Sequence, residues 1–204
     1  MPRIDTKIFY AAALSKHGLT HRALHWNSVN NQETRFEMLC GFLPDEMREI
    51  TIADAGCGFA DLFLYLDRQM RSPGAYVGLE LMPQMCEEAH QRTGCEIIQC
   101  NILEDPLPDA DYYLCSGAMN ILTRFETHLF IRRCFEASKK GFVFNLLEGK
   151  DASMVYNYFT PEEIYAIGKE MGVKKVEIKR GYLPQDFTVF FEKKQGCPSA
   201  EGEE

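Results

Sequence analysis

The chain has 204 residues, of which 46% are hydrophobic, and a formal net charge of −8 at pH 7. This length and composition suit one domain with a sizeable core, and the acidic balance makes a nucleic-acid partner unlikely to dominate its function. No stretch approaches the run of about 18 apolar residues that a membrane span needs, and charges bracket the N-terminal apolar segment too closely for a signal peptide. We therefore expect a cytoplasmic protein with no membrane partner.

The N-terminal part predicts two helices. Apolar spacing favours a helix over residues 5–17 that ends at Gly18. A second helix is expected to begin at Asn30, which with Glu33 forms a capping pair, and to run to about Leu43.

The middle of the chain alternates strands and helices, which indicates parallel strands joined by right-handed crossovers. The expected strands are 50–55, 75–80, 96–100, 111–115 and 141–147, and the expected helices are 59–71, 83–93 and 124–138.

A further helix after Pro161 is followed by strands over 173–180 and 187–193, whose short link allows only antiparallel pairing. The prediction is an α/β fold: a Rossmann-like, seven-stranded, mostly parallel sheet with a C-terminal antiparallel hairpin and helices on both faces. Residues 195–204 are predicted to form a flexible tail.

Cysteine and histidine could suggest metal sites, but their spacing does not support one. The eight cysteines include no C-x-x-C pair, so we expect reduced thiols with packing roles. His17, His21 and His25 recur every four residues, yet Gly18 interrupts their helix and no acidic or thiol ligand completes a set nearby. No metal is expected.

A tight glycine turn, Gly56-Cys57-Gly58, follows the first strand and precedes a helix, which is how α/β proteins bind nucleotides or nucleosides. A dinucleotide fingerprint needs a third small residue where this chain has Asp61. A carboxylate there would repel a pyrophosphate, so a NAD-dependent oxidoreductase is a less favoured alternative.

Four segments instead resemble, in order, the motifs of the class I S-adenosylmethionine-dependent methyltransferases. They are Asp54-Ala55-Gly56-Cys57-Gly58, Glu80-Leu81, Asn101-Ile102 and Cys115-Ser116 with Asn120. The resemblance covers residues 48–194, and it implies S-adenosylmethionine as the cofactor. The chain departs from the family pattern at Ala60, often a glycine, and at Asn101, usually an aspartate.

The resemblance also implies roles for these positions. The residues expected to contact the cofactor in the first motif are Asp54, Ala55, Gly56 and Gly58. Glu80 and Leu81 are expected at the ribose, Asn101 and Ile102 at the adenine, and Cys115 and Ser116 near the sulfonium. Asn120 is the polar residue best placed to meet the methyl acceptor, with helix capping as the alternative.

N-terminal additions commonly cover the cofactor in this family, so residues 1–47 are predicted to form a helical lid. In this lid, Arg35 could pair with the methionine carboxylate of the cofactor, and Trp26 could line one side of the cofactor site. The predicted function is methyl transfer from S-adenosylmethionine to an unidentified small-molecule or protein acceptor. A non-catalytic S-adenosylmethionine-binding sensor or partner protein is the alternative.

Overall fold

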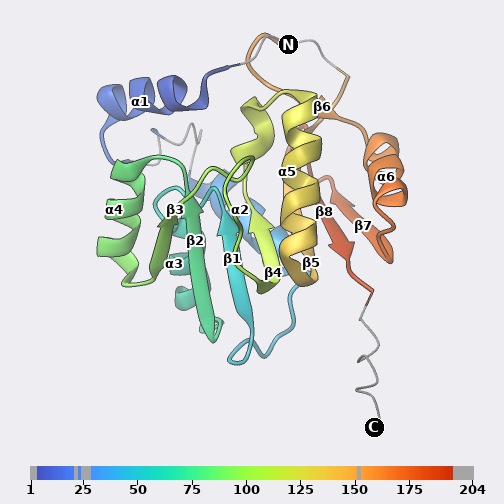
Figure 1. The fold of residues 1–204 in the computed structure, drawn as a ribbon, viewed down its shortest axis with the longest axis horizontal. Coiled ribbons are helices and arrows are strands. Elements are labelled where there is room, and N and C mark those ends of the chain that lie inside the picture. Colours follow the sequence, from blue (N-terminus) through green and yellow to red (C-terminus); the bar gives the residue numbers. More distant parts are fainter. Residues whose placement is uncertain (1–3, 21–22, 24–28, 151–152, 195–204) are drawn as a thin grey trace, which may run out of the picture.

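A computed structural model describes residues 4–20, 23, 29–150 and 153–194. Its centre is one sheet with the strand order β3-β2-β1-β4-β5-β8-β7, and β6 pairs beside β5 (Figure 1). The strands are β1 (Thr51–Ala55), β2 (Ala75–Glu80), β3 (Glu96–Gln99), β4 (Ala110–Cys115), β5 (Ser138–Glu148), β6 (Tyr158–Phe159), β7 (Lys175–Arg180) and β8 (Asp186–Glu192). β1 to β6 pair in parallel, and β8 runs antiparallel to both of its neighbours.

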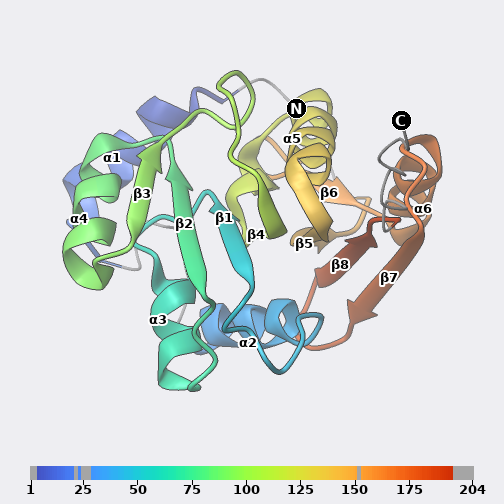
Figure 2. The same ribbon diagram turned by 60° about the horizontal axis from the view of Figure 1, so that its bottom comes forward.

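Helices cover both faces of this sheet. Figure 2 shows α2 and α3 below one face, with α5 on the other. The helices are α1 (Thr6–His17), α2 (Val29–Cys40), α3 (Asp61–Arg68), α4 (Pro83–Thr93), α5 (Arg124–Ala137) and α6 (Pro161–Glu170), with a 3₁₀ turn, η2 (Ala118–Ile121), after β4. Thr123 and Thr160 open α5 and α6 with complete capping boxes, which satisfies backbone N–H groups in both first turns.

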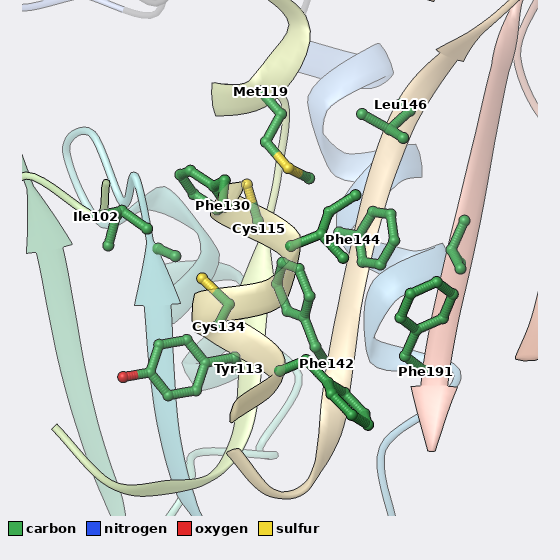
Figure 3. Packing of buried hydrophobic residues seen from close by; sticks show 14 of the residues in the cluster. Ile102, Tyr113, Cys115, Met119, Phe130, Cys134, Phe142, Phe144, Leu146 and Phe191 are labelled. Atoms are coloured by element: carbon green, nitrogen blue, oxygen red, sulfur yellow. The ribbon is translucent and has the colours of Figure 1, made fainter. Parts of the chain in front are cut away.

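Neighbouring residues of the central strands point to opposite faces and build two cores. Leu114 and Val143 pack with α2 and α3, whereas Tyr113 and Phe142 pack with α5. Figure 3 shows the second core, where Phe142 and Phe144 stack with their ring centroids 4.7 Å apart. Both cores are built from contiguous buried hydrophobic side chains, so the carboxyl ends of the strands are held in fixed relative positions.

The predicted fold class is confirmed, as are the order and type of its helices and strands. Three details differ. α3 begins at Asp61 rather than residue 59, because Gly58 and Ala60 both have positive φ and cannot continue a helix. Asn30 does not cap α2, since the helix already includes Val29. The short strand β6 was not predicted.

No helix in the described ranges is both long enough and apolar enough to cross a membrane. The cysteines from Cys40 to Cys134 that the structure describes are free thiols, and most are buried. The predicted tail over 195–204 lies outside the described residues.

Candidate active site

A cavity opens at the carboxyl ends of β1, β2 and β4. Its wall combines the glycine turn, the residues after β2 and β3, η2, and residues of α1 and α2. It includes most positions that the sequence singled out: Asp54, Gly56, Gly58, Glu80, Leu81, Asn101, Ile102, Ser116, Asn120 and Arg35. Residues spread over more than half of the chain therefore meet in one place.

The glycine turn brings β1 close to the segment after β4. Gly56 has φ +78°, and the backbone N–H groups of Gly56 and Cys57 donate to the Leu79 carbonyl at 2.8 and 3.1 Å. A Cβ atom on Gly56 would lie 2.4 Å from the Cβ of Ala118. Glycine is thus required here twice, by its backbone conformation and by the close approach of η2.

Glu80 fixes the turn from the neighbouring strand. The side chain is buried, and its two carboxylate oxygens accept hydrogen bonds from the backbone N–H groups of Gly58 at 3.0 Å and Met82 at 2.9 Å. Burial raises the pKa of Glu80, while these hydrogen bonds oppose the shift. Each oxygen of a carboxylate can accept a further bond, so the group can hold the turn and a ligand together.

Asp54 lies at the end of β1 and is 2% exposed. The Tyr76 hydroxyl donates to one of its carboxylate oxygens at 2.6 Å. Burial raises the pKa of Asp54 to about 7, and the nearby carboxylates of Glu80 and Asp61 act in the same direction. A cationic group in the cavity would favour the charged form of this carboxyl.

The segment after β3 forms a local turn around Asn101. The Asn101 side-chain oxygen accepts from the Leu103 N–H at 3.1 Å, and the Asn101 N–H donates to the Asp105 carboxylate at 2.7 Å. This arrangement holds Ile102 and Leu103 against the cavity, where Leu81 also lines the wall. The result is an apolar slot beside Glu80.

Two predicted contact residues lie elsewhere. Ala55 and Cys115 are fully buried in the core shared with α5, and neither side chain is among the described residues that line the cavity. Strand alternation explains this, because Cys115 points to the same face as Tyr113 (Figure 3). Their side chains therefore pack in the core, whereas Ser116 lines the cavity, and the predicted cofactor contacts of Ala55 and Cys115 stay predictions.

Arg35 has a partner that the sequence did not indicate. Its guanidinium donates to the Asp186 carboxylate at the start of β8, 151 residues away. Asp186 is 2% exposed and also accepts from the Tyr182 hydroxyl at 2.7 Å. Since Arg35 lines the cavity as well, its predicted contact with a methionine carboxylate stays a prediction.

Asp61, used above to argue against a pyrophosphate, also has close partners. Arg92 of α4 lies 2.8 Å from one of its oxygens, and the Gln32 side-chain amide donates to the other at 3.0 Å. These contacts tie α2, α3 and α4 together beside the cavity.

Of the remaining lid residue and the three histidines considered as metal ligands, only His17 is described. Trp26 lies outside the described residues, as do His21 and His25. Within the described ranges, no group of three or more His, Cys, Asp or Glu side chains is arranged to hold a metal ion.

Aromatic side chains form another part of the cavity wall. α1 contributes Phe9 and Tyr10 to the wall, and Tyr156 joins them from the connection after β5. Both α1 aromatics look like ordinary members of a helix face in the sequence. In the sequence, the signal for these two residues was that large aromatic side chains stand next to each other on one helix.

The wall fits S-adenosylmethionine in its chemistry. An acidic side chain with unused acceptor capacity lies beside an apolar slot that suits adenine, and buried carboxylates face a space that suits a cationic sulfonium and ammonium group. Gly56 has no side chain, which allows the turn to lie close to Ala118 of η2.

Comparisons with known proteins agree with this geometry. Residues 52–141 match the sequence model of a methyltransferase domain. No curated protein sequence matches the chain.

Solved structures share the fold at low sequence identity. A chain of the complex between the Trm112 methyltransferase activator and a methyltransferase of Haloferax volcanii is 16% identical with a TM-score of 0.68, over 93% of this chain and 97% of that one. A Thermotoga maritima methyltransferase, described as a possible histamine N-methyltransferase, is 14% identical with a TM-score of 0.66, over 91% and 100%. Magnesium protoporphyrin IX methyltransferase from Synechocystis, solved with S-adenosylhomocysteine, is 12% identical with a TM-score of 0.61, over 80% and 81%.

Proposed function

We propose that this protein, a class I S-adenosylmethionine-dependent methyltransferase by its domain and fold, methylates a small molecule bound at the apolar end of its cavity. The cofactor and the reaction class follow from the methyltransferase domain and from neighbours crystallised with S-adenosylmethionine or S-adenosylhomocysteine. The size class of the acceptor and the role of each residue are the proposal.

The observation that carries the proposal is the placement of Glu80. Its carboxylate is buried at the cavity wall and fixed by two backbone N–H groups, one of them from the glycine turn. A vicinal diol is the ligand that suits two adjacent acceptor oxygens, so we assign Glu80 to the ribose hydroxyls. Asn101, Ile102 and Leu81 would then hold the adenine.

When bound, S-adenosylmethionine would supply an electrophilic methyl group, whose transfer would leave the carbon–sulfur electron pair on sulfur and any displaced acceptor proton to the solvent. The protein's task is to align the two reactants and to exclude water. Asp54 and Ser116 would lie beside the cationic part of the cofactor, and Asn120 would face the acceptor. Asn120 is the residue to which we assign the catalytic contact.

We also propose that residues 1–47 act as a cover for the domain formed by 48–194. α1 supplies Thr6, Phe9 and Tyr10 to the cavity wall, and α2 supplies Gln32 and Arg35. The magnesium protoporphyrin IX methyltransferase shows by its name that this fold accepts non-protein substrates. An apolar end covered by helices is better suited to such a molecule than to a protein surface.

Binding of S-adenosylhomocysteine tests the proposal. Titration calorimetry should show one site, and a ligand at 100 times its Kd should raise the free energy of unfolding by about 2.7 kcal/mol. NAD⁺ should give neither signal. The proposal fails if NAD⁺ binds and S-adenosylhomocysteine does not.

A further inference from the structure

The side-chain carbonyl of Asn120 is unsatisfied in the cavity wall. Asn120 is 9% exposed and lines the cavity, and its Oδ1 atom has no hydrogen-bond partner among the residues that the structure describes. Leaving a buried carbonyl without a partner is unfavourable, so such atoms need a specific explanation. A group supplied by a ligand is one.

Two other buried asparagines beside η2 show that the region can satisfy amides. Asn145 accepts from the Gly117 N–H at 2.9 Å, and Asn157 donates from its amide nitrogen to the Thr127 hydroxyl at 3.2 Å. Both are as deeply buried as Asn120 or more so. Asn120 is therefore the exception in a neighbourhood where polar side chains are otherwise paired.

The orphaned amide is not the result of a loose backbone. The Asn120 N–H donates to the Gly117 carbonyl at 3.1 Å, and the Asn120 carbonyl accepts from the Asn157 N–H at 2.7 Å. Asn157 is in turn tied to α5 through Thr127. The position of Asn120 is thus fixed from both η2 and the connection after β5.

The surroundings of Asn120 are apolar. Ile121 and Leu122 follow it in the chain and are buried, and the cavity wall also includes the apolar Phe130 and the aromatic Tyr156. No lysine or histidine is among the described wall residues, and the arginine of the wall, Arg35, is paired with Asp186. An anionic ligand would find no dedicated counter-charge at this end.

Resting on the proposed function, we infer that the methyl acceptor is a small, uncharged, largely apolar molecule that carries a hydroxyl or N–H group, and that this group donates a hydrogen bond to Asn120 Oδ1. Asn120 then sets acceptor specificity. A carbonyl that is already buried discriminates strongly, because an acceptor that lacks the donor leaves it unpaired.

The free protein gives the first readout. Asn120→Leu replaces an unpaired carbonyl by an apolar group of similar size, so the stability of the free protein should be unchanged or higher. The matched variant Asn157→Leu removes a satisfied amide and should be less stable than the wild type. If Asn120→Leu is destabilised as much as Asn157→Leu, the Asn120 amide has an internal structural role and the inference is wrong.

Neutral aromatic probes give the second readout. Phenol, toluene and anisole are each titrated by NMR into protein saturated with S-adenosylhomocysteine. Phenol should bind about 10-fold more tightly than toluene, the effect of one hydrogen bond, and more tightly than anisole, whose oxygen has no proton. In Asn120→Leu the preference should disappear.

The outcomes separate the two proposals. Failure of S-adenosylhomocysteine to bind the wild type contradicts the proposed function itself. If it binds but phenol shows no advantage, if phenol does not bind at millimolar concentration, or if the advantage persists in Asn120→Leu, only the inference about Asn120 is overturned. Tighter binding of anisole than phenol would likewise overturn it.

Discussion

The two ends of the cavity are built in different ways. At the cofactor end, Glu80 and Asn101 sit at strand ends and already have backbone hydrogen bonds before any ligand arrives. At the acceptor end, the wall includes η2 and the connection after β5, and Asn120 Oδ1 has no described partner. A common cofactor needs a preformed site, whereas the acceptor end carries what is particular to this protein.

Gly56 is where the two ends meet, and changing it should have the largest effect. Gly56→Ala would force an alanine to adopt a φ of +78° and would place its Cβ atom 2.4 Å from the Cβ of Ala118. We expect a loss of about 4 kcal/mol in the free energy of unfolding, from backbone strain and overpacking together, measured by denaturant titration.

Gly94→Ala is the matched control. Gly94 has a similar φ of +69°, but nothing lies within 4 Å of the Cβ position. Its substitution should cost only about 1 kcal/mol. Equal losses in the two variants would mean that η2 moves aside easily and that the ends are not rigidly joined.

Arg35 tests whether the lid belongs to the cofactor end. Arg35→Ala removes the cationic partner of the buried Asp186, which keeps the hydrogen bond from the Tyr182 hydroxyl, and should lower the free energy of unfolding by about 3 kcal/mol. If Arg35 also contacts the methionine carboxylate, affinity for S-adenosylhomocysteine should fall while affinity for adenosine does not. Calorimetry with both ligands measures this.

Arg68→Ala provides the comparison, because its ion pair with Glu33 is exposed. The change in stability there should stay below about 1 kcal/mol. If Arg35→Ala loses affinity for S-adenosylhomocysteine and adenosine equally, the predicted contact between Arg35 and the methionine carboxylate is wrong. Arg35 would then be only a structural link to β8.

Glu80→Gln should weaken S-adenosylhomocysteine binding by about 2 kcal/mol, roughly 30-fold, because charge-assisted hydrogen bonds to the ribose are lost. The amide keeps the shape of the side chain and one acceptor oxygen, so the fold should persist. Glu104→Gln, at an exposed position after β3, should leave the affinity unchanged. Unaltered binding in Glu80→Gln would assign the ribose to another part of the wall.

Asp54 predicts a pH dependence at the cofactor end. The folded protein keeps the Asp54 proton up to about pH 7, whereas the unfolded chain releases it near the ordinary pKa of 3.8. Between these values the native state binds more protons, so this group makes the free energy of unfolding fall as the pH rises. The slope is at most about 1.4 kcal/mol per pH unit.

Asp54→Asn should remove this component, seen as the difference between the unfolding curves of the two proteins from pH 4 to 7. The exposed Asp45→Asn should leave the wild-type slope in place. A wild-type slope in Asp54→Asn would show that other carboxyls carry the pH dependence.

The sequence singled out many residues that line the cavity at the strand ends because their signals are local. A strand period, a glycine turn and an acid at a strand end each occupy a few consecutive residues, and parallel topology brings Asp54, Glu80 and Asn101 to one edge of the sheet. The same local reasoning did not take account of strand alternation, which turns the Cys115 side chain into the core rather than the cavity.

The features that were missed are non-local. The Arg35–Asp186 pair joins residues 151 apart, and no periodicity or spacing reports such a contact. The aromatic wall from α1 depends on how that helix docks over the strand ends. The unpaired state of Asn120 depends on every neighbour at once, so only coordinates could reveal it.

A crystal structure with S-adenosylhomocysteine tests the central claim most directly. We predict the ribose hydroxyls within hydrogen-bond distance of the Glu80 carboxylate, the adenine between Leu81 and Ile102, and the sulfur directed toward Ser116 and Asn120. A ligand bound outside this cavity, or seated in it with the ribose away from Glu80, would contradict the account.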